Sequence, residues 1–231
     1  MKSLDYVAIT YDEKRTPKTD YPSQMAMYFQ ERFMLKPGSI FLELACGRGD
    51  FLRAFHDIGL NCSAVDISDS SVELNKVFGA KKCDVTCEKL PYEDNTFDIV
   101  YSKSLVEHMW DATFLMSEIL RVLKHGGLCI TLTPDWVSQM PVFYEDYTHC
   151  RPYTVDSLKD LMTTSGFNKV ETEHFCQHPF IWRSESYQFL ATILRLCIST
   201  PTGRVLTKFT RVKFFRWAVE RMVLATGFKH T

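Results

Sequence analysis

Short runs of apolar residues alternate with stretches of helical periodicity over most of the chain. The runs predict buried β-strands, and the periodic stretches predict α-helices that bury one face. Turn and capping residues such as Pro37 and Asp111 separate the two kinds of segment. The predicted strands cover 40–44, 62–65, 82–85, 97–101 and 128–132, and the predicted helices cover 48–58, 68–78, 111–124, 154–166, 185–198 and 204–220.

Strands that alternate with helices predict an α/β fold with a parallel sheet and helices on both faces. Acidic residues stand at the ends of the first two predicted strands and within the third, at Glu43, Asp66 and Asp84. The ligand crevice of an open α/β sheet lies at the carboxyl ends of its strands. We therefore expect all three acids to face one crevice.

The turn after the first strand, Glu43–Asp50, carries Gly47 and Gly49. Glycines at such a turn let the backbone approach a ligand, either a dinucleotide or S-adenosylmethionine. The dinucleotide fingerprint needs a third glycine where this chain has Leu52, and Glu43 would sit next to the pyrophosphate. Both features argue against NAD.

Five segments resemble class I S-adenosylmethionine-dependent methyltransferases: FLELACGRGD (41–50), AVDIS (64–68), CDVTCEKLPYEDNTFDIVYSKSLVEHM (83–109), ILRVLKHGGLCITLTP (119–134) and MVLATGFK (222–229). Ala45 replaces the usual first glycine of that family's first motif. The resemblance implies a Rossmann-like, doubly wound sheet of seven strands. The sheet would be mostly parallel, with an antiparallel last strand and a helical insertion before it.

The same resemblance implies S-adenosylmethionine as cofactor and S-adenosylhomocysteine as product. In it, Asp66 would hold the ribose hydroxyls, Asp84 and Val85 would face the adenine, and Glu43 would lie near the methionine end. The expected cofactor-binding residues are Glu43, Ala45, Cys46, Gly47, Gly49, Asp66, Ile67, Asp84, Val85 and Ser102.

We predict a single domain over 1–231, because neither an internal repeat nor a linker is visible in the sequence. Within it, 1–37 would cover the cofactor, 38–175 would form the cofactor-binding core, 176–221 would be the helical insertion and 222–231 would hold the last strand. In the first of these segments, residues 6–21 are polar and contain proline, and could fold over the cofactor.

The polar and aromatic loop after the fifth strand, 133–154, is where an acceptor would meet the methyl group. Such a mixture suits a sugar, because rings stack on its apolar faces while polar groups bind its hydroxyls. DYTHCRPYT (146–154) resembles a segment of methyltransferases associated with glycan and lipopolysaccharide biosynthesis in bacteria and large viruses. We therefore expect O-methylation of a sugar hydroxyl on a glycan or nucleotide sugar. The alternatives are another small molecule, lipid or amine as acceptor, or a non-catalytic cofactor-binding domain.

A hydroxyl acceptor needs a base, and His149 is the candidate, with Asp146 as its orienter or as the direct proton acceptor. Asp135, Tyr147 and Arg151 are candidate acceptor-binding residues. The alternative is that Asp146, His149 and Arg151 only stabilise the loop. His108 reads as a structural residue beside the cofactor.

No metal is predicted, although Asp135, Asp146 and His149 would suit a divalent ion. The eight cysteines contain no CxxC pair, and several lie in apolar stretches, which indicates buried thiols in a reducing compartment and argues against zinc.

Charge is distributed unevenly, although the net charge of -1 gives no reason to expect a nucleic-acid partner. Seven basic residues and one acid, Glu220, lie between Pro201 and Thr231. The helices over 185–220 could form a lid, an interface of a homodimer, or a contact with a membrane or lipid-linked glycan. The N-terminus lacks a signal peptide's apolar core, so we expect a cytoplasmic protein, with the membrane surface as an alternative site.

Overall fold

The computed structural model describes residues 17–210 and 214–231. Its strands are β1 (Ile40–Leu44), β2 (Asn61–Asp66), β3 (Lys81–Lys82), β4 (Phe97–Lys103), β5 (Leu123–Pro134), β6 (Asn168–Cys176) and β7 (Arg221–Phe228). Its α-helices are α2 (Tyr21–Phe33), α3 (Asp50–Asp57), α4 (Asp69–Leu74), α5 (Thr113–Val122), α6 (Trp136–Gln139), α7 (Val155–Thr164), α8 (Glu185–Cys197), α9 (Thr200–Thr210) and α10 (Phe214–Val219). Short 3-10 helices are η1 (Lys76–Phe78), η2 (Val106–His108), η3 (Phe143–Glu145) and η4 (Pro179–Ile181).

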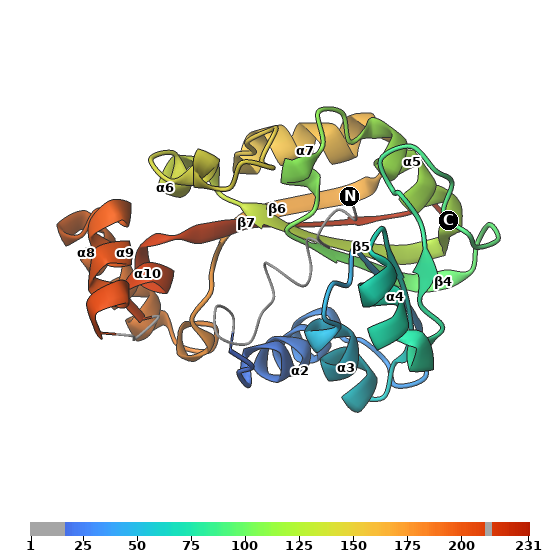
Figure 1. The fold of residues 1–231 in the computed structure, drawn as a ribbon, viewed down its shortest axis with the longest axis horizontal. Coiled ribbons are helices and arrows are strands. Elements are labelled where there is room, and N and C mark those ends of the chain that lie inside the picture. Colours follow the sequence, from blue (N-terminus) through green and yellow to red (C-terminus); the bar gives the residue numbers. More distant parts are fainter. Residues whose placement is uncertain (1–16, 211–213) are drawn as a thin grey trace, which may run out of the picture.

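The seven strands form one sheet in the order β3-β2-β1-β4-β5-β7-β6 (Figure 1). Strands β1 to β5 pair in parallel, and β7 is antiparallel to both β5 and β6. This confirms the predicted Rossmann-like sheet, its antiparallel last strand and the helices before it. β7 begins beside the end of β5, so α6 and α8–α10 stand at the edge where the ligand crevice is expected.

Two apolar cores cover the two faces of the sheet, because neighbouring residues of a strand point to opposite sides. On β1, Leu42 belongs to the core beneath α5 and α7, and Phe41 belongs to the core beneath α2 and α3. In the second core the buried face of α2, including Met25 and Phe29, packs with Phe55 of α3. Helix α2 was not anticipated in the sequence analysis.

Several predicted boundaries were wrong. The third strand is only Lys81–Lys82, so Asp84 lies in the turn beyond it rather than in a strand. The fifth strand begins at Leu123, because its first residues pair with Phe97 of β4. The basic helix predicted over 204–220 is two helices, α9 and α10, and residues 211–213 between them lie outside the described part of the chain.

A buried carboxylate holds the two basic helices to the end of the sheet. Glu220 is 1% exposed and binds the guanidinium of Arg204 from α9 and, at 2.7 Å, Nε of Arg216 from α10. The lone acid among the C-terminal basic residues therefore organises two of them. Within the described ranges no single helix is long and apolar enough to cross a membrane, although Ser186–Cys197 and Thr200–Thr210, bent by 103°, pass that test as a pair.

Neutralising Glu220 should loosen these helices. Glu220→Gln keeps the shape of the side chain but leaves Arg216 without a charge partner among the described residues and Arg204 with Glu145 alone, so we expect a loss of about 1–3 kcal/mol in unfolding free energy. Urea denaturation followed by circular dichroism measures it. Glu73→Gln is the control, because Glu73 and Lys76 form an exposed pair at 3.6 Å whose loss should change stability by less than about 0.5 kcal/mol. Equal losses in both variants would contradict the assignment.

Candidate functional site

The turn between β1 and α3 is held in a left-handed conformation at three positions. Ala45, Gly47 and Gly49 have φ values of 53°, 51° and 76°. Ala45, in the place of the family's first glycine, therefore adopts a conformation that L-residues rarely take. The turn brings the backbone of β1 against the end of β2, where the Cys46 amide donates to the Val65 carbonyl at 3.3 Å.

Two buried side chains fix the middle of this turn. Asp66 Oδ2 accepts from the amide of Gly47 at 2.7 Å, and its Oδ1 accepts from the amide of Ser68 at 2.9 Å. Asn75 is fully buried, and its Nδ2 donates to the carbonyls of Gly47 at 3.0 Å and Ser71 at 2.8 Å. Sequence reasoning found Asp66 but missed Asn75, whose role depends on the fold of α4 back onto the turn.

Glu43 is the unusual group of the site. The carboxylate is 4% exposed, and its Oε2 has no hydrogen-bond partner among the described residues. Burial raises the pKa of Glu43 well above its usual range, and the nearby Asp66 and Asp50 raise it further. A buried polar atom without a partner costs free energy, so its persistence points to a ligand that satisfies it.

A cavity of about 220 Å³ opens on Glu43. Ala45 and Cys46 of the turn line it, as do Lys103 and Ser104 from the end of β4. Pro17, Thr19, Tyr21, Pro22, Arg48, Asp50, Phe51, Gln177 and Trp217 complete the wall. The cavity thus joins a buried carboxylate to cationic groups, which suits a ligand with both an ammonium and a carboxylate.

The expected cofactor residues fall into two groups. Glu43, Ala45 and Cys46 line the cavity, Gly47 and Gly49 shape the turn beside it, and Asp66 supports the turn. Ile67, which follows Asp66, is 60% exposed and offers an apolar surface beside the carboxylate.

The remaining three expected cofactor residues do not line this cavity. Ser102 is 1% exposed and bonds to Thr131 Oγ1 at 3.1 Å between β4 and β5, while Ser104, two residues later and with φ at 56°, reaches the cavity instead. Val85 is buried in the core beneath α5 rather than open to a ligand.

Asp84 Oδ1 accepts from the amide of Thr86 at 3.0 Å and from its hydroxyl at 2.6 Å. The hydroxyl bond is the main cause that lowers the pKa of Asp84. The carboxylate is therefore an anion that closes a turn. The chain before it runs beside Asp66, because the Cys83 amide donates to the Asp66 carbonyl at 3.0 Å.

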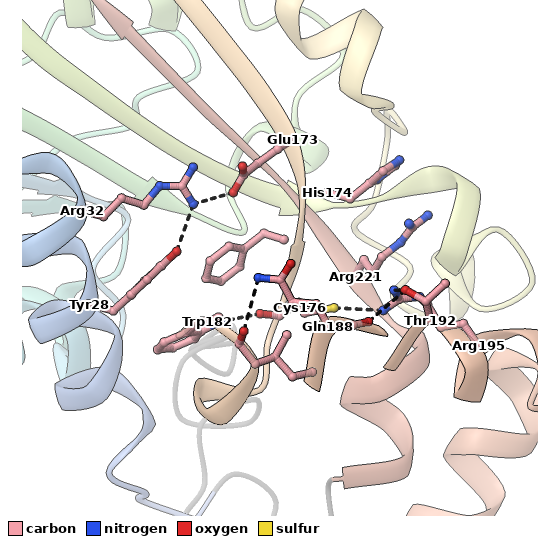
Figure 2. A pocket seen from close by; sticks show the side chains of 12 residues that line it. Tyr28, Arg32, Glu173, His174, Cys176, Trp182, Gln188, Thr192, Arg195 and Arg221 are labelled. Carbon is pink, nitrogen blue, oxygen red and sulfur yellow. Dashed lines mark hydrogen bonds and ion pairs between the residues drawn. The ribbon is translucent and has the colours of Figure 1, made fainter. Parts of the chain in front are cut away.

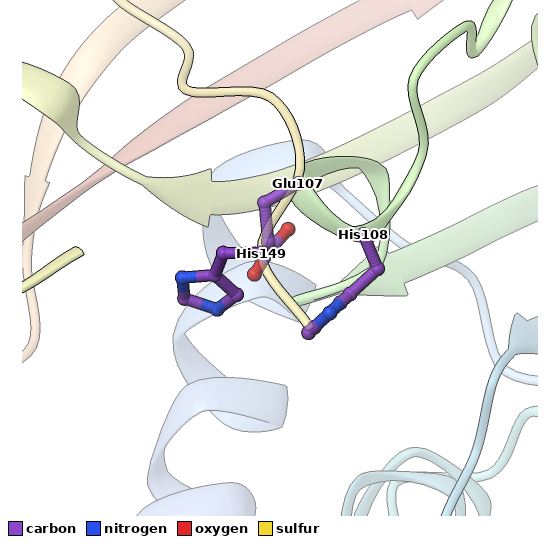
Figure 3. Close-up of side chains that lie close together, drawn as sticks. All are labelled: Glu107, His108 and His149. Carbon is purple, nitrogen blue, oxygen red and sulfur yellow. The ribbon is translucent and has the colours of Figure 1, made fainter. Parts of the chain in front are cut away.

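Two imidazoles and a buried carboxylate lie together on the acceptor side. Figure 3 shows Glu107, His108 and His149, which come from η2 and from the loop after η3. The amides of Cys150 and Arg151 donate to the Glu107 carbonyl at 2.8 and 3.1 Å, so the two loops are joined through their backbones. Glu107 is fully buried; its Oε2 accepts from Thr133 Oγ1 at 2.9 Å, and its Oε1 has no partner among the described residues.

The hydrogen bonds of the two rings fix their tautomers. His149 Nδ1 is 2.7 Å from the carbonyl of Phe143, which can only accept, so Nδ1 carries the proton and Nε2 keeps its lone pair. Thr148 Oγ1 lies 2.6 Å from Asp146 Oδ1 and 2.9 Å from His108 Nδ1. Because Thr148 donates to the carboxylate, His108 Nδ1 must be the donor to Thr148.

The role expected for Asp146 as orienter of His149 needs correction. Asp146 Oδ2 lies 4.0 Å from His149 Nε2, beyond hydrogen-bond distance and on the unprotonated side of the ring. The Phe143 carbonyl orients the ring instead. Asp146 Oδ2 is near enough to His149 Nε2 to form an ion pair only if the imidazole were protonated.

The three expected acceptor-binding residues lie apart. Asp135 is fully buried, caps α6 and binds Arg221 Nη2 at 3.0 Å, so it serves the fold rather than an acceptor. Tyr147 is 89% exposed, and Arg151 donates to the Trp110 carbonyl at 3.1 Å. Asp135, Asp146 and His149 therefore do not form the suggested metal set; within the described ranges Glu107, His108 and His149 hold ligand atoms within 4.8 Å of one another.

The sequence of this chain is similar to known proteins. Residues 42–131, from β1 to β5, match the sequence profile of a methyltransferase domain. Among curated relatives, phosphoethanolamine N-methyltransferase 2 of Caenorhabditis elegans is 30% identical over 152 residues, covering 60% of this chain and 35% of the relative. A probable S-adenosylmethionine-dependent methyltransferase of Mycolicibacterium smegmatis is 26% identical over 58% of this chain and 54% of its own. The chain thus spans between a third and just over half of these relatives.

Solved structures share the fold. A chain in the complex of the Haloferax volcanii Trm112 methyltransferase activator with a methyltransferase superposes with a TM-score of 0.70 at 16% identity, covering all of both chains. Phosphoethanolamine N-methyltransferase 2 of Haemonchus contortus, in complex with S-adenosylmethionine, gives 0.63 at 19% identity over all of this chain and 61% of its own. The chain shares the fold of these methyltransferases. The glycan association expected from 146–154 gains no support from these matches.

Asn75 makes Gly49 irreplaceable. A Cβ on Gly49 would lie 1.8 Å from Asn75 Oδ1, and Asn75 cannot move without breaking the turn. We expect Gly49→Ala to cost about 2–4 kcal/mol in unfolding free energy and to weaken cofactor binding, measured by denaturation and calorimetry. Gly79→Ala is the control, because Gly79 also has positive φ, 66°, but a Cβ there meets nothing within 4 Å. Similar losses in the two variants would mean that backbone conformation alone, and not Asn75, sets the requirement.

Burial of Glu107 should make stability depend on pH. Burial raises the pKa of Glu107 to about 7, above its unfolded value, so the folded state holds the proton more tightly. The resulting stabilisation is present at acidic pH and is lost as pH rises from about 4.5 to about 7, by on the order of 3 kcal/mol. Relative to Glu107→Gln, the wild type should therefore lose stability over that range in urea titrations. Exposed Glu93→Gln is the control and should parallel the wild type; parallel curves for Glu107→Gln would overturn the assignment.

Proposed function

We propose that this protein transfers a methyl group from S-adenosylmethionine to a hydroxyl of a small polar acceptor, with a sugar as the acceptor. S-adenosylmethionine would supply, when bound, a sulfonium methyl group that a nucleophile can take, with S-adenosylhomocysteine as the leaving group. The cavity at Glu43 fits its amino acid end, because the unpartnered Oε2 can accept from the ammonium while Lys103 and Arg48 line the same wall. The two bonds that Asp66 accepts hold its carboxylate still at the end of β2, where a ribose diol would bind.

The observation that carries the hydroxyl acceptor is the state of His149. Its Nε2 bears a lone pair because Nδ1 is committed to the Phe143 carbonyl, and Asp146 stands 4.0 Å away to stabilise the charge. Nε2 would take the hydroxyl proton as the acceptor oxygen bonds to the methyl carbon and the carbon–sulfur bond breaks to release S-adenosylhomocysteine, and Asp146 would stabilise the imidazolium. The loop that carries Glu107 and His108 continues directly from Lys103 and Ser104, which line the cofactor cavity.

An amine acceptor is the second candidate, supported by the relatives named phosphoethanolamine N-methyltransferases. A neutral amine attacks without prior loss of a proton, so it does not depend on a strong base. Tyr147, which is largely exposed, and Arg151 remain proposals as acceptor contacts. We likewise propose a cytoplasmic location, a glycan or lipid-linked partner near the basic helices, and a homodimer.

Loss of His149 tests the proposal. His149→Ala should lower turnover on a hydroxyl acceptor by about 100- to 10,000-fold with little change in S-adenosylmethionine affinity, because the imidazole acts only on the acceptor. Labelled S-adenosylmethionine with a panel of nucleotide sugars, glycosides, lipid-linked glycans and amines measures transfer, with EDTA present to keep metals from His149. Added imidazole should restore part of the rate.

His125→Ala is the matched control, since that ring lies at the start of β5 and bonds to the His230 carbonyl. It should transfer at the wild-type rate. Full activity of His149→Ala on an amine, with none on hydroxyls in either protein, would replace the proposal with the second candidate. Absence of cofactor binding in the wild type would exclude both.

A further inference from the structure

A second cavity, of about 400 Å³, lies beyond the cofactor cavity at the end of β6. Figure 2 shows its walls, with Arg32 and Tyr28 from α2 on one side and Arg195 from α8 and Arg221 from β7 on the other. Its volume falls in the range of small-molecule sites. The function proposed above does not use it.

Cationic donors in this cavity outnumber their anionic partners. Arg32 is paired with Glu173 at 2.6 Å, and Arg221 Nη2 is paired with Asp135 at 3.0 Å. Arg195 instead donates to neutral groups, Cys176 Sγ at 3.0 Å and Thr192 Oγ1 at 2.8 Å, and in the described part of the chain no carboxylate lies within ion-pair distance of it.

Arg221 has a further donor to spare. Its Nε is buried and, among the residues that the structure describes, finds no acceptor. A buried N–H of a charged group without an acceptor is costly, and an anionic oxygen would satisfy it.

His174 lines the cavity together with Arg195 and Arg221. Burial lowers its pKa, and Arg221 and Arg195 lower it further, against the opposing effect of Asp135. The neutral imidazole therefore adds no positive charge and can donate or accept beside two guanidinium groups.

Aromatic rings form the remaining wall. Trp182 stacks on Tyr28 with ring centroids 4.9 Å apart and on Phe175 at 5.4 Å. These rings present an apolar surface next to the guanidinium groups, which suits a ligand with an anionic end and a ring.

We propose that this cavity binds a phosphate group carried by the methyl acceptor, so that the acceptor is a phosphorylated sugar or nucleotide sugar. Guanidinium groups bind phosphate oxygens through paired N–H donors, and the cavity has room for more than the phosphate. The proposal rests on the proposed function. The two cavities share a wall, so one acceptor could reach both. Cys176 lines this one, Gln177 lines the cofactor cavity, and Tyr21 of the cofactor cavity contacts Trp182 at 5.9 Å.

Binding of phosphate compounds tests the cavity without methyl transfer. In calorimetry at constant ionic strength in chloride, inorganic phosphate and glucose 6-phosphate should bind the wild type, and glucose should bind at least about tenfold more weakly. Arg195→Gln should weaken glucose 6-phosphate at least tenfold, and Arg195→Lys should fall between. Arg183→Gln is the control, because Arg183 is exposed and paired with Glu31 at 2.7 Å, and it should bind as the wild type does. Unchanged S-adenosylmethionine binding shows that each variant is folded.

Equal affinity of wild type and Arg195→Gln for glucose 6-phosphate would overturn the proposal, as would equal affinity of the wild type for glucose and its phosphate. Kinetics separate the two proposals. Methyl transfer to phosphorylated sugars with the same KM in Arg195→Gln would overturn the phosphate site and leave the methyltransferase. Phosphate binding that depends on Arg195, without transfer to any acceptor in the panel, would overturn the acceptor role and the proposed function together.

Discussion

The site depends on how Gly47 is held between two strands and a helix. Asp66 accepts from its amide and Asn75 donates to its carbonyl, so both polar groups of one peptide segment are fixed by buried side chains. These bonds hold three alternate left-handed positions, at 45, 47 and 49, that would otherwise cost free energy, most of all at Ala45. Because the turn is fixed, Glu43 and the start of α3 present a constant surface to a ligand.

The local rules of stability are broken where the ligands are expected. Glu43 and Glu107 are buried carboxyl groups, each with one oxygen that has no partner in the described structure, and burial raises the pKa of both. Elsewhere buried acids are paired, as Glu220 is with two arginines and Asp135 with Arg221. This contrast separates acids that hold the fold together from acids that await a ligand or a proton, and exposure alone would not separate them, since all four are nearly or fully buried.

The sequence was sufficient for features that are local or periodic. Apolar runs located β1, β2, β4 and β5, and Gly47 and Gly49 predicted the turn after β1, because these signals lie within ten residues of one another. Features that depend on contacts between residues far apart in the sequence could not be predicted from it. Asn75 acts through the return of α4, Ser102 faces Thr131 rather than the cavity, and Asp135 meets Arg221, 86 residues away. The 2-residue third strand leaves Asp84 in a turn for the same reason, since strand length is set by pairing with β2.

Asp135 links the acceptor loop to the phosphate cavity. It follows the last residue of β5 and forms an isolated bridge with Tyr153 near the end of the acceptor loop. Its carboxylate contacts both Arg221 and His174. Both contacts are made by Asp135 Oδ2. Arg221 Nη2 is therefore paired with a carboxylate, while its Nε has no acceptor among the described residues. An anion entering the cavity would therefore face an arginine that is already held in place and still has a donor to give. Ordering that side chain in advance removes part of the entropy cost of binding. Asp135, which the sequence predicted to bind the acceptor, would thus act indirectly. It positions Arg221, and Arg221 would bind the phosphate of the acceptor.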